Sequence, residues 1–207
     1  MIHCIDLVAA EAAEQFLFRW HRAINKQAQQ PGFIGAKLHS VYKQLNRDGY
    51  ALISVVSWED DQSLDQARRE RPLFSYLSDE QFARDSNRYH VINQGGDAAL
   101  PPRDGDIVIT NPYRISAEEA PRHAEMWEQS KRHMQGREGF VDAVLYQCRS
   151  PHGDYYFFSR ARWRSEALFM SQFEGRDFKT IIAPFEGIFS ICLSRTLSSI
   201  DAEACSA

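Results

Sequence analysis

Apolar and polar positions recur in the same order in two halves of the chain. Trp20 precedes Phe33 by 13 residues, and Trp127 precedes Phe140 by 13 residues. Each Phe opens an alternating run, FIGAKLHSVY or FVDAVLYQC, which a polar turn separates from a second run, YALISVVSW or YYFFSRARW. Alternation with a period of two is typical of half-buried strands, and a short polar break between two such runs indicates a hairpin. The shared order of landmarks predicts two copies of one structural unit.

Each copy predicts the element order β-α-β-β-α-β. The β-rich segments IHCIDLV and IVITNPYRI open the copies, YHVINQ and IFSICLSRTL close them, and second helices are expected over 60–69 and 165–174. Ser116 with Glu119 three residues later forms a capping-box pattern, in which each side chain satisfies the other residue's free amide. Pro121 then lies in the first helical turn, or the helix begins a few residues later.

The repeats set the predicted domain boundaries. We expect an N-terminal ferredoxin-like repeat over 1–94, a linker over 95–104, a C-terminal repeat over 105–198 and a tail over 199–207. The linker is rich in Gly, Pro and Asp, which mark loops. Short segments carrying Phe74 or Phe178 follow the second helices.

The strand around residue 55 predicts how the copies combine. Its apolar residues lie on both faces: Leu52, Val56 and Trp58 on one, Ala51, Ile53 and Val55 on the other. A sheet with one wet face would alternate cleanly, so both faces are expected to be covered. The predicted fold class is α+β, with two ferredoxin-like βαββαβ repeats forming an intramolecular dimeric α+β barrel.

Composition and charge narrow the class of protein. Hydrophobic residues make up 43% and charged residues 25% of 207 residues, and the formal net charge is −4. This balance gives no basic field for nucleic acid or an anionic membrane. No apolar run reaches the ~18 residues of a spanning helix, and the N-terminus lacks a basic signal-peptide region. The four cysteines form no CxxC pair. We expect a cytoplasmic protein, either a monomer acting as a pseudo-dimer or a homodimer.

The landmarks resemble a known family. The Gly-Phe after the first helix, and the strand-ending Trp163 followed by Ser165, Phe169 and Phe178, are similar to the pattern of the antibiotic biosynthesis monooxygenases. The resemblance covers nearly the whole chain and is better in the second half. It implies a dimeric α+β barrel, here in tandem, and a monooxygenase activity.

Two branches of that family have recognisable sites. In quinone-forming monooxygenases the strand-ending Trp has an Asn four residues before it and a Tyr six residues after it. Around Trp163 these positions are Ser159 and Phe169, and around Trp58 they are Ser54 and Leu64. Both copies therefore match the family's Trp, and neither has the Asn and Tyr that accompany it.

The heme-degrading branch has an Asn in the first strand, which Asn111 matches and which Cys4 replaces in the first repeat. That branch also has a Trp and an axial His, and Gln172 and Ile182 stand at those two positions. Without the His, the expected axial ligand is missing. Heme is therefore expected only under an alternative interpretation.

Asn111 and Trp163 are the candidate catalytic residues. Asn111 lies among apolar neighbours, and a buried amide without partners costs about 1–3 kcal/mol. It either donates to a substrate oxygen or a bound O2 species, or ties down the strand edge beside Pro112. Trp163 either stacks on a planar ligand and donates its indole N–H, or anchors the core as Trp58 does. Tyr113, Ser159 and Phe169 are the candidate substrate-binding residues; Trp20 and Trp127 are expected in the core.

Other motifs exclude common chemistries. The histidines show neither HxxxH nor HExxH spacing, so no dedicated metal site is expected. His123 shares a helix face with Trp127 and either reaches a pocket mouth or is solvated. GxGxxG after a strand, GxxxxGK[ST] and GxSxG are also absent, so nucleotide-phosphate binding and serine hydrolysis are not indicated.

Three functions remain open. The first is a cofactor-independent monooxygenase that oxidises a planar aromatic, such as a quinol or an anthrone, with O2. The second is a heme-binding or heme-degrading protein. The third is a non-catalytic barrel that binds a small aromatic or hydrophobic molecule. Whether the protein is an enzyme at all stays open at this point; the expected partner is a small molecule in each case.

Overall fold

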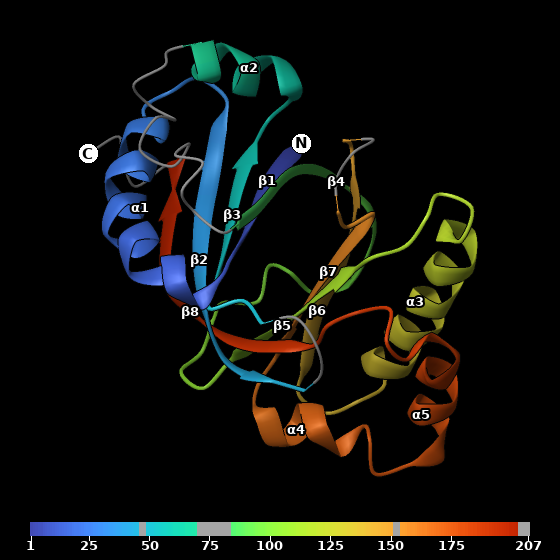
Figure 1. Ribbon diagram of the computed structural model, residues 1–207. Coiled ribbons are helices and arrows are strands. Elements are labelled where there is room, and N and C mark those ends of the chain that lie inside the picture. The colour runs from blue at the N-terminus through green and yellow to red at the C-terminus, as the bar shows by residue number, and fades with distance from the viewer. Residues whose placement is uncertain (46–48, 70–83, 151–153, 203–207) are drawn as a thin grey trace. The chain divides into compact units, whose positions relative to one another are not determined.

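The computed structural model describes residues 1–45, 49–69, 84–150 and 154–202 (Figure 1). The chain divides into two compact units. The first unit contains residues 1–41, 49–90 and 196–207, and the second contains residues 42–48 and 91–195. The segment that carries Phe74 and the residue Cys205 lie outside the described residues.

The first unit has the predicted element order. It contains β1 (Ile2–Val8), a 3-10 turn (Ala10–Ala12), α1 (Ala13–Gln27), β2 (Phe33–Gln44), β3 (Leu52–Trp58), α2 (Asp61–Arg69) and β4 (Arg84–Gly96). Its strands pair antiparallel in the order β4-β1-β3-β2. The unit is therefore a ferredoxin-like sheet with helices inserted after its first and third strands.

The second unit repeats this order. It contains β5 (Ile107–Tyr113), α3 (Ala120–Gln135), β6 (Phe140–Cys148), β7 (Phe157–Trp163), α4 (Glu166–Ser171), α5 (Arg176–Ile182), a 3-10 turn (Ala183–Phe185) and β8 (Cys192–Asp201). Its strands pair antiparallel in the order β8-β5-β7-β6. Figure 1 shows α3 and α5 side by side in this unit.

Hydrogen bonding between neighbouring strands closes the eight strands into a barrel, in the order β1-β3-β2-β8-β5-β7-β6-β4. Together with the two βαββαβ units, this confirms the predicted α+β fold class. Strands β2, β4 and β8 each contribute residues to both units. The compact units therefore differ at these strand ends from the repeats expected at 1–94 and 105–198, and β4 includes the first two residues of the 95–104 linker.

The Phe and Trp landmarks are paired residues on neighbouring strands. Phe33 on β2 pairs with Trp58 on β3, and Phe140 on β6 pairs with Trp163 on β7. Both pairs have ring centroids 5.6 Å apart in an edge-to-face arrangement. A shift of register follows each Phe, so each unit has the same bulge at the same place. The sequence spacing from Phe to Trp thus reports a shared hairpin geometry.

The glycine before each Phe is required by the turn. Gly32 and Gly139 have φ angles of 81° and 82°, a region that side chains with a Cβ rarely adopt. A Cβ at Gly139 would also collide with the side chain of Leu168, and one at Gly32 would collide with Ser63. The repeated Gly-Phe motif therefore fixes both the turn and the close approach of the following helix.

Both faces of the strands are buried, as predicted. Trp58 and Leu52 belong to the apolar cluster between the first unit's sheet and its helices. On the opposite face, Ile53 of β3 and its neighbours Ile5 and Leu7 of β1 are at most 1% exposed.

The predicted capping box forms at the start of the second unit's first helix. The Glu119 carboxylate accepts a hydrogen bond from the Ser116 backbone N–H at 2.9 Å, and the Ser116 hydroxyl accepts one from the Glu119 N–H at 3.3 Å. The α-helix itself begins at Ala120, with Pro121 in its first turn. Pro121 fits there because its missing N–H is not needed.

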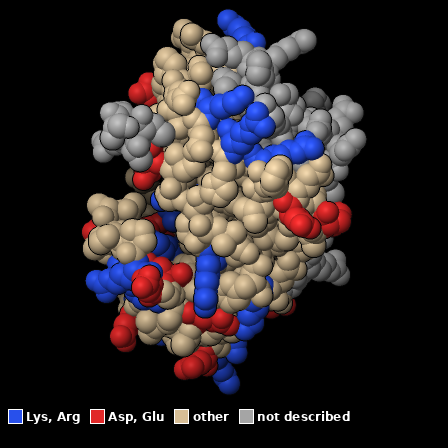
Figure 2. Space-filling model, turned by 90° about the vertical axis from the view of Figure 1, so that its left-hand side faces the viewer, with Lys and Arg blue, Asp and Glu red and all other residues tan. Residues whose placement is uncertain are grey.

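Acidic and basic side chains share the face of the molecule shown in Figure 2, with wide areas of neither sign between them. Within the described part of the chain, no helix is long and apolar enough to cross a membrane.

Candidate functional site

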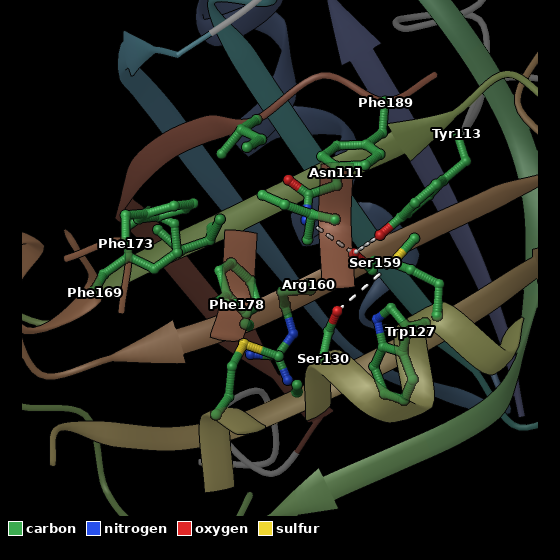
Figure 3. A pocket seen from close by; sticks show the side chains of 17 residues that line it. Asn111, Tyr113, Trp127, Ser130, Ser159, Arg160, Phe169, Phe173, Phe178 and Phe189 are labelled. Carbon is green, nitrogen blue, oxygen red and sulfur yellow. Dashed lines mark hydrogen bonds between the residues drawn. The ribbon is translucent and has the colours of Figure 1, made fainter. Parts of the chain in front are cut away.

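A cavity lies within the second unit (Figure 3). Its volume is about 50 Å³, on the measure by which a single buried water needs ~10–15 Å³. The cavity is therefore several times larger than one water requires. Its walls come from β5, α3, β6, β7, the α4–α5 region and the segment just before β8. The aromatic lining residues are Tyr113, Trp127, Phe169, Phe173, Phe178 and Phe189, and the polar ones are Asn111, Ser130, Ser159 and Arg160.

Three polar side chains meet at one end of the cavity. Asn111 on β5 is paired with Ser159 on β7, and Tyr113 follows two residues later on the same face. The Ser159 hydroxyl lies 3.2 Å from the Asn111 amide and 3.4 Å from the Tyr113 hydroxyl. Figure 3 shows the hydroxyl between these two groups. Three of the five residues predicted for the site are thus brought together by strand register alone.

The Asn111 amide is fully satisfied in one orientation. With its nitrogen donating to the backbone carbonyls of Thr110 at 2.9 Å and Ser190 at 3.2 Å, its oxygen accepts from the Ser159 hydroxyl at 3.2 Å. The opposite orientation places the oxygen against acceptors only, so the hydrogen-bond network selects the first. Asn111 therefore ties β5 to the segment around Ser190 and orients Ser159, instead of presenting a free N–H to the cavity.

Trp163 does not line the cavity. It is fully buried, and its ring packs edge-to-face on Phe140 and on Phe169, whose centroid is 5.7 Å away. Phe169 lines the cavity and Trp163 does not. Trp163 therefore packs behind Phe169 and supports this part of the cavity wall. Its indole N–H has no hydrogen-bond partner among the described residues.

The aromatic wall is continuous. Phe169 packs on Phe173 at 5.5 Å between ring centroids, and Phe173 packs on Phe178 at 5.2 Å. On the opposite side of Asn111, Phe189 lies 5.3 Å from the Tyr113 ring. Faces and edges of this kind make favourable contacts with another flat aromatic ring.

The electrostatics of the lining favour an anion but supply no strong base. Burial raises the pKa of Tyr113 to about 12, so its phenol stays neutral and can donate a hydrogen bond. Arg160 is the charged residue of the described lining. It shares the buried Asp142 with Arg162, so two cations face one anion in this group. Among the described residues, no carboxylate or imidazole lines the cavity.

The first unit has a different set of residues at the equivalent positions. Ile2 pairs with Trp58 as Ile107 pairs with Trp163, and by this register Asp6, opposite Ser54, corresponds to Asn111. The expectation that Cys4 replaces Asn111 is therefore wrong. The helix of the second unit begins two residues later relative to its strand than that of the first, so counting back from the helix misplaces the match.

Sequence reasoning placed Trp127 in the core and missed its second property. Trp127 is buried, and it also lines the cavity. Only its place on α3, four residues from His123 and facing β5–β7, could have indicated this. His123 is neither solvated nor in the described lining: it is 3% exposed, its Nδ1 lies 2.9 Å from the Glu119 carbonyl, and its ring packs on Phe185.

Heme ligation of the kind known from the heme-degrading branch does not fit these residues. The position of the axial His is Ile182, an apolar lining residue, and the position of the Trp is the buried Gln172. In the described part of the chain, no group of three or more His, Cys, Asp or Glu residues comes together to hold a metal ion.

Comparison with known proteins supports the fold. No protein-family model matches the sequence, and no curated protein matches it. The structure is similar to that of an anthrone oxidase-like protein, with a TM-score of 0.71 at 12% identity over 97% of this chain and 93% of that chain. A candidate monooxygenase from Fusobacterium nucleatum gives 0.66 at 13% identity over 97% and 93% of the two chains.

A third similar structure is described as a major regulator of staphylococcal pathogenesis, with a TM-score of 0.55 at 7% identity over 96% of this chain and all of that chain. At these identities the likeness shows the fold, an α+β barrel shared with proteins named as monooxygenases. Membership of the antibiotic biosynthesis monooxygenase family stays a prediction.

Proposed function

We propose that the second unit's cavity binds a planar aromatic molecule bearing an oxygen substituent and oxidises it with O2 without a cofactor. One observation carries this proposal: an aromatic-walled cavity ends in a buried hydroxyl pair, Ser159 and Tyr113, oriented by Asn111. The anthrone oxidase-like and monooxygenase names of proteins with the same fold support the reaction class.

The substrate supplies every electron in this reaction. An anthrone-like substrate loses two hydrogens from its CH2 group, and that carbon forms a C=O bond with one atom of O2. The other oxygen atom and the two hydrogens leave as water, so the equation balances without an external reductant. The first step is loss of a proton to give an electron-rich anion, which transfers an electron to O2.

The protein's contribution is binding and charge stabilisation. The Tyr113 hydroxyl is the donor for the developing oxyanion, and Ser159, whose own hydrogen goes to the Asn111 oxygen, holds that hydroxyl in position. The cation at Arg160 favours negative charge nearby. A prearranged donor of this kind acts strongly where water is excluded. Because the described lining holds no carboxylate or imidazole, a substrate with an acidic C–H or phenol fits best. Phe169 supplies the stacking surface, and Trp163 supports it from behind.

The test compares two buried serines at equivalent positions. Oxygen uptake with 1,8-dihydroxyanthrone is measured for the unaltered protein and for Asn111→Ala, Ser159→Ala and Ser54→Ala. We expect a loss of about 10–100-fold for Ser159→Ala, somewhat less than for removing an oxyanion donor itself, because the Tyr113 hydroxyl loses the group that positions it. Asn111→Ala should lower turnover as well, because Ser159 loses its orienting partner. Ser54→Ala, in the first unit, should keep turnover.

Unaltered turnover in Ser159→Ala would remove the hydroxyl pair from the site, and unaltered turnover in Asn111→Ala would remove Asn111. Circular dichroism on each variant separates a lost site from a lost fold.

A second candidate function, non-catalytic binding of a hydrophobic aromatic, is favoured by the absence of a carboxylate or imidazole from the described lining. It predicts saturable binding of the anthrone with oxygen uptake no faster than in buffer. A hemin titration completes the comparison: a tight, stoichiometric Soret shift would replace both proposals with heme binding.

A further inference from the structure

The indole N–H of Trp127 is a hydrogen-bond donor at the cavity. Trp127 lies on α3, is 4% exposed and lines the cavity. None of the described residues accepts a hydrogen bond from its Nε1, and Figure 3 shows this nitrogen on the side of the ring turned toward Ser130 and Ser159. Unlike the indole nitrogens of Trp58 and Trp163, this Nε1 is not among the fully buried atoms that lack a partner, so a ligand in the cavity that supplies an acceptor can reach it.

The first unit shows an equivalent Trp whose N–H bonds directly to a serine. Trp20, 13 residues before its Phe as Trp127 is, donates from Nε1 to the hydroxyl of Ser54 at 3.0 Å, and both residues are fully buried. Ser54 lies four residues before the strand-ending Trp, as Ser159 does in the second unit. The donor and the acceptor that bond directly in one unit are thus both present in the other.

Two residues on β5 explain why the second pair does not bond in the same way. The Ser159 hydroxyl interacts with Asn111 and Tyr113. The register places Asp6 and Val8 at these positions in the first unit. Val8 offers no hydroxyl, whereas Tyr113 adds one to the polar end of the cavity. The serine therefore has other partners in the second unit, and the indole N–H is left for a ligand.

A lysine side chain lies over the face of the Trp127 ring. The Lys131 ammonium lies 5.6 Å from the ring centroid, in cation–π range. Lys131 is itself fixed by Glu128 at 2.6 Å and by the Asn93 side chain at 2.9 Å. A ring anchored in this way presents its N–H in a fixed direction.

We propose that Trp127 is a ligand-binding residue whose Nε1–H donates a hydrogen bond to a carbonyl or phenolate oxygen of the planar aromatic ligand. The ligand oxygen takes the acceptor role that Ser54 has in the first unit. The inference rests on the proposed function only for the aromatic nature of the ligand. It names the residue that recognises the oxygen substituent, and it excludes hydrocarbons of the same shape as good ligands.

The direct test uses two probes of one shape, 9-fluorenone with a carbonyl oxygen and fluorene without it. The protein is labelled with ¹⁵N on the indole nitrogen of tryptophan, and the Trp127 signal is assigned by its loss in Trp127→Phe. Under anaerobic conditions, fluorenone should move the Trp127 indole proton downfield while the Trp20 signal stays in place. A saturating titration that leaves the Trp127 signal unmoved, or no binding of fluorenone, overturns the proposal.

Affinity gives the second readout. The ratio of the Kd for fluorene to the Kd for fluorenone is measured in the unaltered protein, in Trp127→Phe and in Trp20→Phe. We expect fluorenone to bind about five- to tenfold more tightly, the effect of one hydrogen bond. Trp127→Phe should lose this preference, and Trp20→Phe should keep it. A preference that survives in Trp127→Phe contradicts the proposal.

These measurements need no turnover, so the two proposals fail separately. A Trp127 shift without oxygen uptake keeps the binding inference and rejects the monooxygenase. Oxygen uptake that survives in Trp127→Phe at full rate and with unchanged KM rejects the binding inference and keeps the monooxygenase.

Discussion

The two units place the same Trp and Ser in different surroundings. In the first, Trp20 belongs to the apolar core and donates directly to the buried Ser54. In the second, Trp127 lines a cavity, and Ser159 interacts with Asn111 and Tyr113. The helices, the Phe–Trp pair and the bulge are shared, so the difference arises from a few side chains on one strand. The same helix position can thus be a core residue in one copy and line a cavity in the other.

The largest expected effect comes from filling the cavity. Ala143 on β6 lines it, and Ala36 on β2 is the equivalent residue in the first unit's core. Ala143→Leu should lower affinity for fluorenone, and turnover of an anthrone, by about 100-fold or more, because the added side chain occupies ligand space. It should cost little stability. Ala36→Leu should instead destabilise the protein by about 1–3 kcal/mol through overpacking.

Urea unfolding followed by circular dichroism measures the stability of both variants, and fluorenone titration measures binding. Equal stability losses in the two variants would show that the second unit is packed as tightly as the first.

A second effect is expected at high pH. Burial raises the folded-state pKa of Tyr113 to about 12, against about 10 in the unfolded chain. Between these values the unfolded chain loses its proton first, so the free energy of unfolding should fall as pH rises from 10 to 12. By linkage the loss is on the order of 2 kcal/mol. Val8 stands at the equivalent place in the first unit and has no such group.

Urea unfolding at pH 9, 10.5 and 11.5 checks this for the unaltered protein and for Tyr113→Phe. The variant should lack this component of the alkaline loss; parallel stability profiles would contradict the burial of a neutral phenol.

The smallest effect separates the two helix tryptophans by stability. Trp20→Phe leaves the buried Ser54 hydroxyl without its donor, whereas Trp127→Phe breaks no hydrogen bond with a described residue. Trp20→Phe should therefore be more destabilising by about 1 kcal/mol or more. Thermal unfolding of both variants measures the difference, and the reverse order would mean that Trp127 already has a partner in the free protein.

Much of the fold could be predicted because its signals are local. The two-residue alternation of the strands, the Gly-Phe turns and the Phe-to-Trp spacing each reflect backbone geometry within one hairpin. The capping box at Ser116 and Glu119 is local as well. For the same reason Asn111, Tyr113 and Ser159 were found together: they share a face of two neighbouring strands.

The rest depends on contacts distant in sequence. Trp20 and Trp127 have the same local pattern, and only their partners on other elements distinguish a core residue from a cavity residue. The orientation of the Asn111 amide depends on the Ser190 carbonyl, 79 residues further on. The match of Asp6 to Asn111 depends on strand pairing, which counting along the chain does not determine. Trp163 could be identified as important, but not as lying behind Phe169.

We propose above that the second unit oxidises an oxygen-bearing aromatic with O2 alone. The most direct measurement supplies ¹⁸O2 and 1,8-dihydroxyanthrone to chelator-treated protein free of flavin and heme, and follows the product by mass spectrometry. We expect a quinone that carries one ¹⁸O atom and forms faster than in buffer. The rate above that of buffer should be lost in Ala143→Leu and kept in Ser54→Ala. Product formation at the rate of buffer, or only after addition of heme, flavin or a metal ion, would contradict the proposal.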